Sequence, residues 1–237
     1  MNDLGLSFLK WMQMHRTPEG EVFFQNVTVG GEGLWLWAIL GVLFWIWGSR
    51  PAYRAGLALV AGDLLACTVK YVFCIPRPWV KDPGILPVDS AKAAAFGYSF
   101  PSGHAASTAA LWGGIGAAVG RIWFWGLVLA WIWLVAFSRL YLGVHTPVDV
   151  AGSLLLAVPV VWGMGRVQDW TERNPGRDWI VVAGAVLAAL AAEAFLHVRP
   201  VPEDAWPTYG RDVTRAASAF VAYVAAWRIE RNWIRFE

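Results

Sequence analysis

The sequence predicts an all-α fold, a polytopic bundle of six or seven transmembrane helices, and three observations support this class. Hydrophobic residues fill 57% of the 237 positions and charged residues only 15%, whereas soluble domains are usually about a quarter charged. The chain contains 17 Trp residues, and Trp is enriched where a protein crosses the membrane–water interface. Long apolar segments recur along most of the chain, so we expect an integral membrane protein whose main partner is the lipid bilayer.

Seven segments are apolar enough to cross a bilayer. Several fall short of the ~20 residues that a span needs, so flanking aromatic and small residues must complete them, which leaves the count at six or seven. Apolar and polar residues do not alternate as they would in a barrel strand, so each span must be a helix. In chain order the segments are Leu34–Gly48, Tyr53–Cys74, His104–Gly120, Ile122–Ser138, Val148–Gly165, Trp179–Leu196 and Val213–Trp227.

Residues 1–33 differ from these segments because they mix apolar and charged positions. Leu9 and Trp11 flank Lys10, and Phe23 lies close to Glu19. A helix that lies on the membrane surface suits such a mixture better than a span does. We therefore predict an interfacial N-terminal segment.

The charge balance and the cysteines exclude some interpretations. Nineteen basic residues against seventeen acidic ones leave a net charge of +2, without the basic patch that nucleic-acid binding requires, so no nucleic-acid partner is expected. Cys67 and Cys74 are the two cysteines. On one helix they would stand ~10 Å apart along the axis, too far for a disulfide.

Three polar motifs interrupt the apolar pattern, and each lies at the end of a predicted span. The motifs are 70–78 (KYVFCIPRP), 101–104 (PSGH) and 138–149 (SRLYLGVHTPVD). The first closes the second span and the next opens the third, so these two share a membrane face. The last one joins the fourth and fifth spans. Because the third and fourth spans are joined by a tight turn at Gly120–Arg121, all three motifs must lie on one face, whichever way the protein is inserted.

These motifs bring three cations to one face, and the cations are Lys70, Arg77 and Arg139. Cations packed at a membrane boundary repel one another unless an anion lies between them. Arg presents forked donors that match phosphate oxygens, and Lys acts as a point charge. The PSGH motif opens a helix, whose free N–H groups favour an anion, and Gly103 lets that backbone approach a ligand closely. The pattern therefore predicts a phosphate-binding site.

Two histidines and a carboxylate add chemistry to this site. His145 precedes Asp149 by four residues, so the carboxylate can accept the Nδ1 proton across one helical turn. That hydrogen bond would leave Nε2 free to act as a nucleophile. His104 comes from another helix and could protonate the departing oxygen.

The three motifs resemble the signature of the type 2 phosphatidic acid phosphatase superfamily. That signature reads Lys-x6-Arg-Pro, then Pro-Ser-Gly-His, then Ser-Arg-x5-His-x3-Asp, and this sequence fills every position without a substitution. The surrounding apolar segments resemble the membrane branch of the family. The resemblance implies one membrane phosphatase domain over residues 1–237, with its catalytic motifs between residues 70 and 149.

The resemblance also implies a role for each residue of the motifs. His145 would form a phosphohistidine, Asp149 would orient it, and His104 would serve first as an acid and then as a base. The residues that would hold the phosphoryl oxygens are Lys70, Arg77, Ser102, Gly103 and Arg139. The family needs no metal and no cofactor, and nothing in this sequence has zinc-ligand spacing.

Two further polar residues are candidates for the site. Ser138 belongs to the third motif, where it fits either a phosphate contact or a hydrogen bond at a helix end. Asp63 lies inside an apolar segment, where an unpaired charge is unfavourable. We expect Asp63 to bridge neighbouring helices rather than to touch substrate.

The leading functional hypothesis is a membrane phosphatase that hydrolyses lipid phosphates or pyrophosphates. By resemblance, the candidate substrates include undecaprenyl pyrophosphate, phosphatidylglycerol phosphate and phosphatidic acid. Three alternatives stay open: a glucose-6-phosphatase-like enzyme, suggested by Gly62-Asp63 before Lys70, a phospholipid headgroup transferase, and a lipid binder without catalysis. Release of phosphate from lipid and sugar phosphates would separate them.

The distribution of basic residues predicts the orientation. The C-terminal tail carries Arg228, Arg231 and Arg235, and it lies opposite the motifs by the parity of the spans. Basic flanks tend to be cytoplasmic, so we expect an active site on the non-cytoplasmic face of a bacterial inner membrane. The loop 198–212 would share that face, where it either lines the substrate entrance through Arg199, Tyr209 and Arg211 or is a plain polar loop.

Overall fold

The computed structural model describes residues 4–95, 97–200 and 210–236, and every regular element within these ranges is helical. In chain order the elements are α1 (Leu4–Met14), α2 (Pro18–Val29), α3 (Gly33–Trp47), α4 (Ser49–Phe73), α5 (Pro78–Lys81), α6 (Asp89–Ala93), α7 (Gly103–Val119), α8 (Ile122–Tyr141), α9 (Pro147–Arg173), α10 (Trp179–Val198), α11 (Arg211–Ile229) and the π-helix η2 (Glu230–Ile234). The predicted all-α class is confirmed for the described residues. Each of the seven predicted segments falls largely on a single helix.

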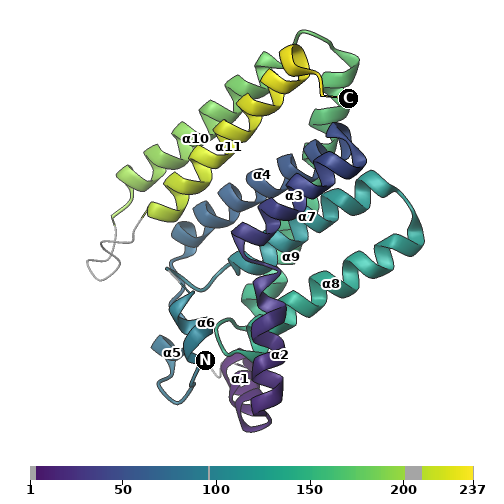
Figure 1. Cartoon of the computed structure of the whole chain (residues 1–237). Helices are drawn as coiled ribbons and strands as arrows, with labels where there is room; N and C mark the ends of the chain where they lie inside the picture. Colours follow the sequence, from purple (N-terminus) through teal and green to yellow (C-terminus); the bar gives the residue numbers. More distant parts are fainter. Residues whose placement is uncertain (1–3, 96, 201–209, 237) are drawn as a thin grey trace.

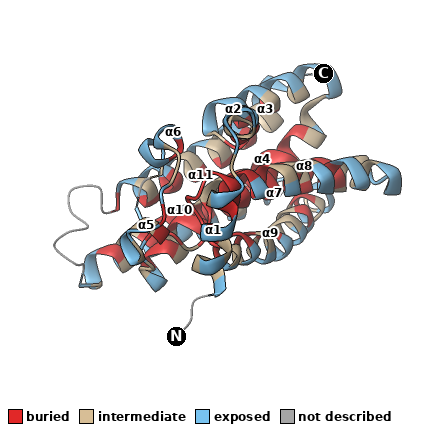
Figure 2. Cartoon of the chain, turned by 90° about the horizontal axis from the view of Figure 1, so that it is seen from below, coloured by how far each residue is buried: buried red, intermediate tan, exposed pale blue. Residues whose placement is uncertain are grey.

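The central helix of the bundle is α4, which packs against α3, α7, α9 and α11. Helices α10 and α11 form a hairpin along one side, and α8 lies on another side with α2 against it (Figure 1). Seen from below, buried residues gather in the middle of the bundle and exposed residues on its periphery (Figure 2). This arrangement surrounds the end of α4 with the starts of other helices.

A glycine lets α4 and α7 approach closely. A Cβ atom added to Gly114 on α7 would lie 2.6 Å from Cα of Ala55 on α4. Any side chain at this position would collide with the neighbouring backbone, and small residues are the usual means by which membrane helices pack closely. The two helices therefore approach closely near the start of α4 and the end of α7.

The start of α9 is fixed by local sequence. Thr146 is the N-cap, and its Oγ1 accepts a hydrogen bond of 3.4 Å from the backbone N–H of Asp149. In return, Oδ2 of Asp149 accepts one of 2.7 Å from the N–H of Thr146. Pro147 occupies the first helical position, which suits its fixed φ and missing donor. The carboxylate of Asp149 is thereby held at the helix start.

By length and composition, four helices of the described chain could cross a membrane, or five if α2 and α3, which are bent by 52°, form one broken span. The four are α4 with α5, α8, α9 and α10. Helices α3 and α7 are short, with 15 and 17 residues, and α11 carries charged residues near both ends. The structure thus supports a membrane protein, while the count of six or seven spans stays a prediction.

Candidate active site

The three polar motifs meet at one end of the bundle, where α4 ends and α7 and α9 begin (Figure 1). Their charged side chains are buried, each at most 7% exposed. These buried residues are Lys70, Arg77, Arg139, His145 and Asp149. Three cations therefore share a small volume from which water is largely excluded.

The two ring nitrogens of His145 lie in different environments, Nε2 beside a guanidinium and Nδ1 beside a carboxylate. Nη1 of Arg77 donates a hydrogen bond of 3.0 Å to Nε2, and a guanidinium can only donate, so Nε2 carries the lone pair. Nδ1 then carries the proton and lies 3.6 Å from Oδ2 of Asp149. Burial and the nearby Arg77 cation lower the pKa of His145 below its usual range. The ring is therefore neutral at pH 7, as a nucleophile must be.

The carboxylate of Asp149 is immobilised by neighbouring donors. Its Oδ2 accepts hydrogen bonds from Oγ of Ser99 at 2.6 Å and from the N–H of Thr146 at 2.7 Å. With two donors on one oxygen, the carboxylate cannot turn away from His145. At 3.6 Å, Nδ1 of His145 lies beside this carboxylate but makes no hydrogen bond with the described residues, so the contact with Arg77 assigns the tautomer.

The guanidinium of Arg77 connects the first and third motifs. Nε donates to the carbonyl of Gly97 at 3.0 Å, and Nη1 also donates to the carbonyl of Val144 at 3.2 Å. Both carbonyls belong to loops, so Arg77 fixes these loops relative to the end of α4.

Lys70 and the N-terminus of α7 form the other side of the site. A Cβ atom added to Gly103 would lie 4.0 Å from Nζ of Lys70, so the ammonium group sits at the first turn of α7. Ser102 is the N-cap, yet its buried Oγ makes no hydrogen bond with the described residues. The N–H of Ser102 donates to the carbonyl of Asp149 at 3.2 Å. An ammonium group, an unused hydroxyl and a helix N-terminus thus lie together, which suits an anion.

The junction of α2 and α3 closes the site from a third side. Nη1 of Arg139 donates to Oγ1 of Thr28, and a Cβ atom added to Gly31 would lie 3.2 Å from Cβ of His104. Nε2 of His104 is buried and makes no hydrogen bond with the described residues. His104 lies within electrostatic range of Arg139 and His145. The structure therefore brings together all eight residues that the motifs single out.

The two further candidates, Ser138 and Asp63, form hydrogen bonds with residues outside the three motifs. Oγ of Ser138 donates to the carbonyl of Val135 at 2.6 Å, a bond within α8 that matches the helix-end alternative. Asp63 accepts a hydrogen bond of 3.1 Å from Oγ of Ser107 on α7. It therefore bridges α4 and α7, as expected for a carboxylate inside an apolar segment.

Ser99 and Thr28 are not among the predicted site residues, although both bind charged residues of the site. Each contact joins residues far apart in sequence, 50 residues for Ser99 with Asp149 and 111 for Thr28 with Arg139. No spacing rule could have found them. The role of Thr146 as an N-cap could be predicted from the sequence, because Thr-Pro-x-Asp at a helix start is a capping pattern.

The predicted entrance loop is only partly described, and Tyr209 lies outside the described residues. Arg211 is exposed, and Nη1 of Arg199 donates to the carbonyl of Val72 at the end of α4. A contact from the start of α11 is better defined, because Oδ1 of Asp212 accepts a hydrogen bond of 2.7 Å from the hydroxyl of Tyr71. This bond ties α11 to the residue that follows Lys70.

The described residues contain no group of three or more His, Cys, Asp or Glu side chains that could hold a metal ion.

Comparison with known proteins identifies a matching family and several similar proteins. The model of the PAP2 superfamily matches residues 51–173, a range that includes all three motifs. The undecaprenyl-diphosphatase BcrC of Bacillus subtilis is 31% identical over 140 residues, which cover 56% of this chain and 68% of BcrC. Lipid phosphate phosphatase delta of Arabidopsis thaliana is 27% identical over 205 residues, which cover 80% of this chain but only 47% of that protein.

Among solved structures, the crystal structure of Aquifex aeolicus LpxE has a similar fold. The TM-score is 0.61 at 22% sequence identity, and the match covers 69% of this chain and 95% of LpxE. At this identity the likeness concerns the fold alone. The common fold includes most of this chain.

Proposed function

This chain belongs to the PAP2 superfamily, and from that premise we propose that it is a membrane phosphatase that hydrolyses lipid phosphates or pyrophosphates through a phosphohistidine. One observation carries the proposal: Nε2 of His145 faces a guanidinium, while its Nδ1 faces a fixed carboxylate. Nε2 is therefore unprotonated and directed to the place where a phosphate would bind Arg77. The role of each residue below is part of this proposal.

In the first step, Nε2 of His145 attacks the terminal phosphorus and the bond from this phosphorus to the leaving oxygen breaks. The leaving oxygen is the ester oxygen of the lipid in a monophosphate and the bridging oxygen in a pyrophosphate. His104 protonates it, and the products are a phosphohistidine and the lipid alcohol or, from a pyrophosphate, the lipid monophosphate. Asp149 stabilises the positive imidazole that forms. Charge that develops on the phosphoryl oxygens is met by cations whose positions are already fixed, an arrangement that lowers the barrier because the donors need not reorganise. These cations belong to Lys70, Arg77 and Arg139.

In the second step, a water molecule attacks the phosphohistidine. His104, now neutral, accepts a proton from this water, the bond from phosphorus to Nε2 breaks, and inorganic phosphate leaves. His145 and His104 return to their starting states. The free hydroxyl of Ser102 and the backbone N–H groups at the start of α7 hold the phosphoryl oxygens in both steps.

A lipid substrate fits the place of the site in the fold. The catalytic end of α4 is the end of a helix that is long and apolar enough to cross a membrane. A lipid could keep its tail in the bilayer while its phosphate enters the cluster of cations. The relatives named for undecaprenyl diphosphate and for lipid phosphates support the same class of substrate.

The proposal is tested by phosphate release from purified protein with undecaprenyl pyrophosphate, phosphatidylglycerol phosphate, phosphatidic acid and glucose 6-phosphate. We expect release from at least one lipid and a loss of more than about 10³-fold in His145→Ala. Acid-labile labelling from a substrate with labelled phosphate should appear in the wild type and be absent from His145→Ala. Turnover of folded His145→Ala at the wild-type rate, or turnover of the sugar phosphate alone, would contradict the proposal.

We also propose that catalysis needs no metal, because three cations and a helix N-terminus already face the phosphate. Activity should therefore persist after EDTA treatment and repurification, and vanadate should inhibit by adopting the geometry of the transition state at Nε2 of His145. The measurement is phosphate release with and without added Mg²⁺. A strict requirement for Mg²⁺ would refute this part of the proposal.

For the membrane arrangement, we propose six or seven spans and an active site on the non-cytoplasmic face of a bacterial inner membrane. The C-terminus lies at the other end of the bundle from the catalytic motifs (Figure 1), and its basic residues suit the cytoplasmic side. An enzyme so placed would act on lipid phosphates of the outer leaflet of that membrane.

A further inference from the structure

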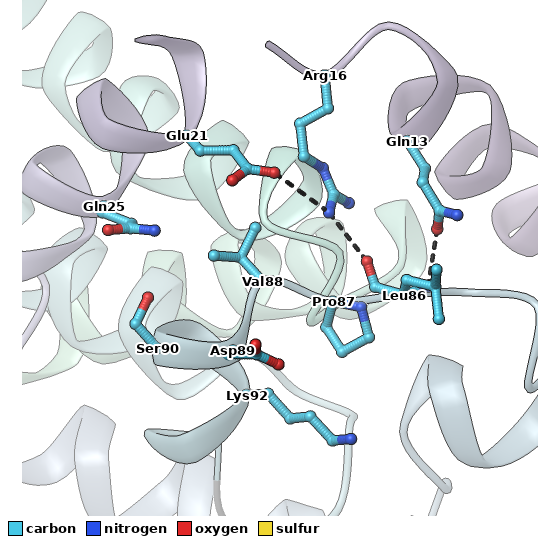
Figure 3. Close-up of a pocket in the computed structure, with 10 residues that line it drawn as sticks. All are labelled: Gln13, Arg16, Glu21, Gln25, Leu86, Pro87, Val88, Asp89, Ser90 and Lys92. Carbon is cyan, nitrogen blue, oxygen red and sulfur yellow. Dashed lines mark hydrogen bonds and ion pairs between the residues drawn. The ribbon is translucent and has the colours of Figure 1, made fainter. Parts of the chain in front are cut away.

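Two regions outside the three motifs lie next to the catalytic end. One is a cavity lined by residues that include parts of α1, α2 and α6 (Figure 3). Leu142 and Val144 are fully buried between this cavity and His145, so the lining of the cavity does not reach the site. The other region is the segment 97–99, which precedes the PSGH motif and contacts the site directly.

The segment 97–99 accepts hydrogen bonds from two cations of the first motif. The carbonyl of Gly97 accepts one of 3.0 Å from Nε of Arg77. The carbonyl of Tyr98 accepts one of 3.5 Å from Nζ of Lys70. Because these acceptors belong to the backbone, the position of the segment helps to set the positions of the guanidinium and of the ammonium group.

The third residue of the segment binds the carboxylate of the site. Oγ of Ser99 donates to Oδ2 of Asp149 at 2.6 Å, and the N–H of Ser99 donates to the carbonyl of Ile75 at 2.7 Å. Three consecutive residues thus contact three charged side chains of the proposed site. A shift of this segment would displace all three charges together.

Asp212 reaches this segment from α11. Its Oδ1 accepts a hydrogen bond of 2.7 Å from the hydroxyl of Tyr71. Its Oδ2 would lie 3.6 Å from a Cβ atom added to Gly97, so the carboxylate lies beside that residue. The buried ring of Tyr71 packs edge-on against the ring of Tyr98, with centroids 5.8 Å apart. The carboxylate and this ring therefore support the segment that binds the two cations.

Local contacts fix the carboxylate of Asp212. It lies in the first turn of α11, where the helix dipole favours a negative charge. The N–H of Gly210, the N-cap of this helix, donates to the hydroxyl of Tyr71 at 3.3 Å. Because this hydroxyl accepts from Gly210 and donates to Asp212, two hydrogen bonds join the start of α11 to α4.

The carboxylate of Asp212 also balances charge at the site. Lys70 and Arg77 lie within electrostatic range of Asp212, and two buried cations repel each other. A carboxylate near them lowers this repulsion. Asp212 lies outside residues 51–173, which match the PAP2 superfamily, so this charge comes from a part of the chain that the family match does not include.

We propose that Asp212 is a positioning residue of the active site, which holds Lys70 and Arg77 in place through Tyr71 and the segment 97–99. It acts through these residues and not on the substrate. This role rests on the proposed phosphatase function and adds a residue of α11 to it. Loss of the link would misplace cations that meet the charge developing on the phosphoryl oxygens, so it would slow the chemical step more than it would weaken substrate binding.

The test measures kcat and KM of phosphate release with the fastest substrate among undecaprenyl pyrophosphate, phosphatidylglycerol phosphate and phosphatidic acid. Asp212→Ala and Tyr71→Phe each remove the bond between the two side chains. Each should lower kcat about tenfold, while KM stays within about twofold of the wild-type value. The double variant should lose no more than either single variant, because all three lack the same bond. Asp212→Asn keeps an oxygen acceptor for the hydroxyl and should retain kcat within about threefold.

Asp169→Ala is the matched control. Asp169 is a half-buried carboxylate that accepts a hydrogen bond of 2.8 Å from Nη2 of Arg54 on α4, and it lies near the end of α9 that is remote from the site. The control should lower the midpoint of thermal unfolding in detergent, as Asp212→Ala does, but keep the wild-type kcat. A purely structural role of Asp212 would give the same result in both variants.

Three results would overturn the inference: a wild-type kcat in Asp212→Ala and Tyr71→Phe, additive losses in the double variant, or an Asp212→Asn variant as slow as Asp212→Ala. A fall of kcat in the control equal to that in Asp212→Ala would overturn it as well. If Asp212→Ala does not fold, Tyr71→Phe decides, because it removes a single oxygen atom. All these results leave the phosphatase proposal intact, whereas a wild type that releases phosphate from no lipid would refute the proposed function itself.

Discussion

In the proposed mechanism, the charge state of His145 sets the pH range in which phosphate is released. Burial and the Arg77 cation lower the pKa of this imidazole, so the proposed nucleophile stays neutral well below pH 6.5, the usual value for histidine. The acid limb of kcat/KM should therefore lie below pH 6.5. Arg77→Met removes one of the causes that lower this pKa and should move this limb toward higher pH, in addition to lowering the rate.

The measurement is kcat/KM against pH, with Arg121→Met as a control, because Arg121 is an exposed cation at the other end of α7 and α8. The control should keep the wild-type limb. An acid limb that does not move in Arg77→Met would contradict this account. The stability of the fold should also decrease toward acid pH. The unfolded state takes up a proton on His145 near pH 6.5 and the folded state does not, so stability falls as the pH drops below that value.

Thr28 tests whether the junction of α2 and α3 belongs to the site. Its hydroxyl accepts a hydrogen bond from Arg139, so Thr28→Val should leave a buried guanidinium donor without its partner. A loss of about tenfold in kcat/KM is expected for such a donor. Thr28→Ser keeps the hydroxyl and should retain most of the activity. Equal activity of the Val and Ser variants would show that the bond does not position Arg139.

At this scale the sequence predicts which motif residues come together better than it predicts their partners. The meeting of the eight motif residues was predictable, because each motif lies at the end of a span; their roles in catalysis stay a prediction. Ser99 and Thr28 were not predictable, because a serine or threonine has many roles and their contacts with Asp149 and Arg139 form only in the folded chain. The membrane boundary makes such partners necessary, since each buried charge needs hydrogen bonds.

Among the elements, α4 and α7 pack against each other along the core of the bundle, and Gly114 allows their close approach. Gly114→Ala would place a Cβ atom 2.6 Å from Cα of Ala55, so the helices must separate, at a cost of about 1–3 kcal/mol. Gly126→Ala on α8 is the control, because a Cβ atom there meets nothing within 4 Å and alanine favours a helix by about 1 kcal/mol.

Thermal unfolding in detergent measures both variants. The midpoint should fall in Gly114→Ala and stay level or rise in Gly126→Ala. Equal midpoints would show that α4 and α7 can adjust without strain, and the proposed contribution of this close approach to stability would then be wrong.

The positions of the helices were predictable, but their packing and their ends were less so. Apolar runs gave the approximate limits of α3, α4 and α7 to α11, since continuous hydrophobicity demands a helix in a bilayer. The bend of 52° between α2 and α3 was not foreseen, and it brings Thr28 and Gly31 to the site. The sequence of residues 1–33 indicated only an amphipathic segment, because pattern alone does not tell what covers its apolar face.

For the whole molecule, the orientation in the membrane follows from the number of helices that cross it and from the distribution of basic residues. The motifs at one end of the bundle and the C-terminus at the other (Figure 1) must face opposite sides of the membrane if α11 crosses it. Burial of three cations at one end is tolerable where the membrane boundary lets a phosphate enter from water. The remaining step is to determine which side that is.

The orientation can be measured by cysteine labelling in a Cys67→Ser/Cys74→Ser background. Asp89 on α6 lies at the catalytic end and is exposed, and Asn174 follows α9 at the opposite end. With a membrane-impermeant thiol reagent on intact cells, Asp89→Cys should be labelled and Asn174→Cys should not, because we expect the basic tail to keep its end in the cytoplasm. Both should be labelled after the cells are permeabilised, which controls for a buried thiol. Labelling of Asn174→Cys alone in intact cells would invert the topology, and the substrate would then have to come from the cytoplasmic leaflet.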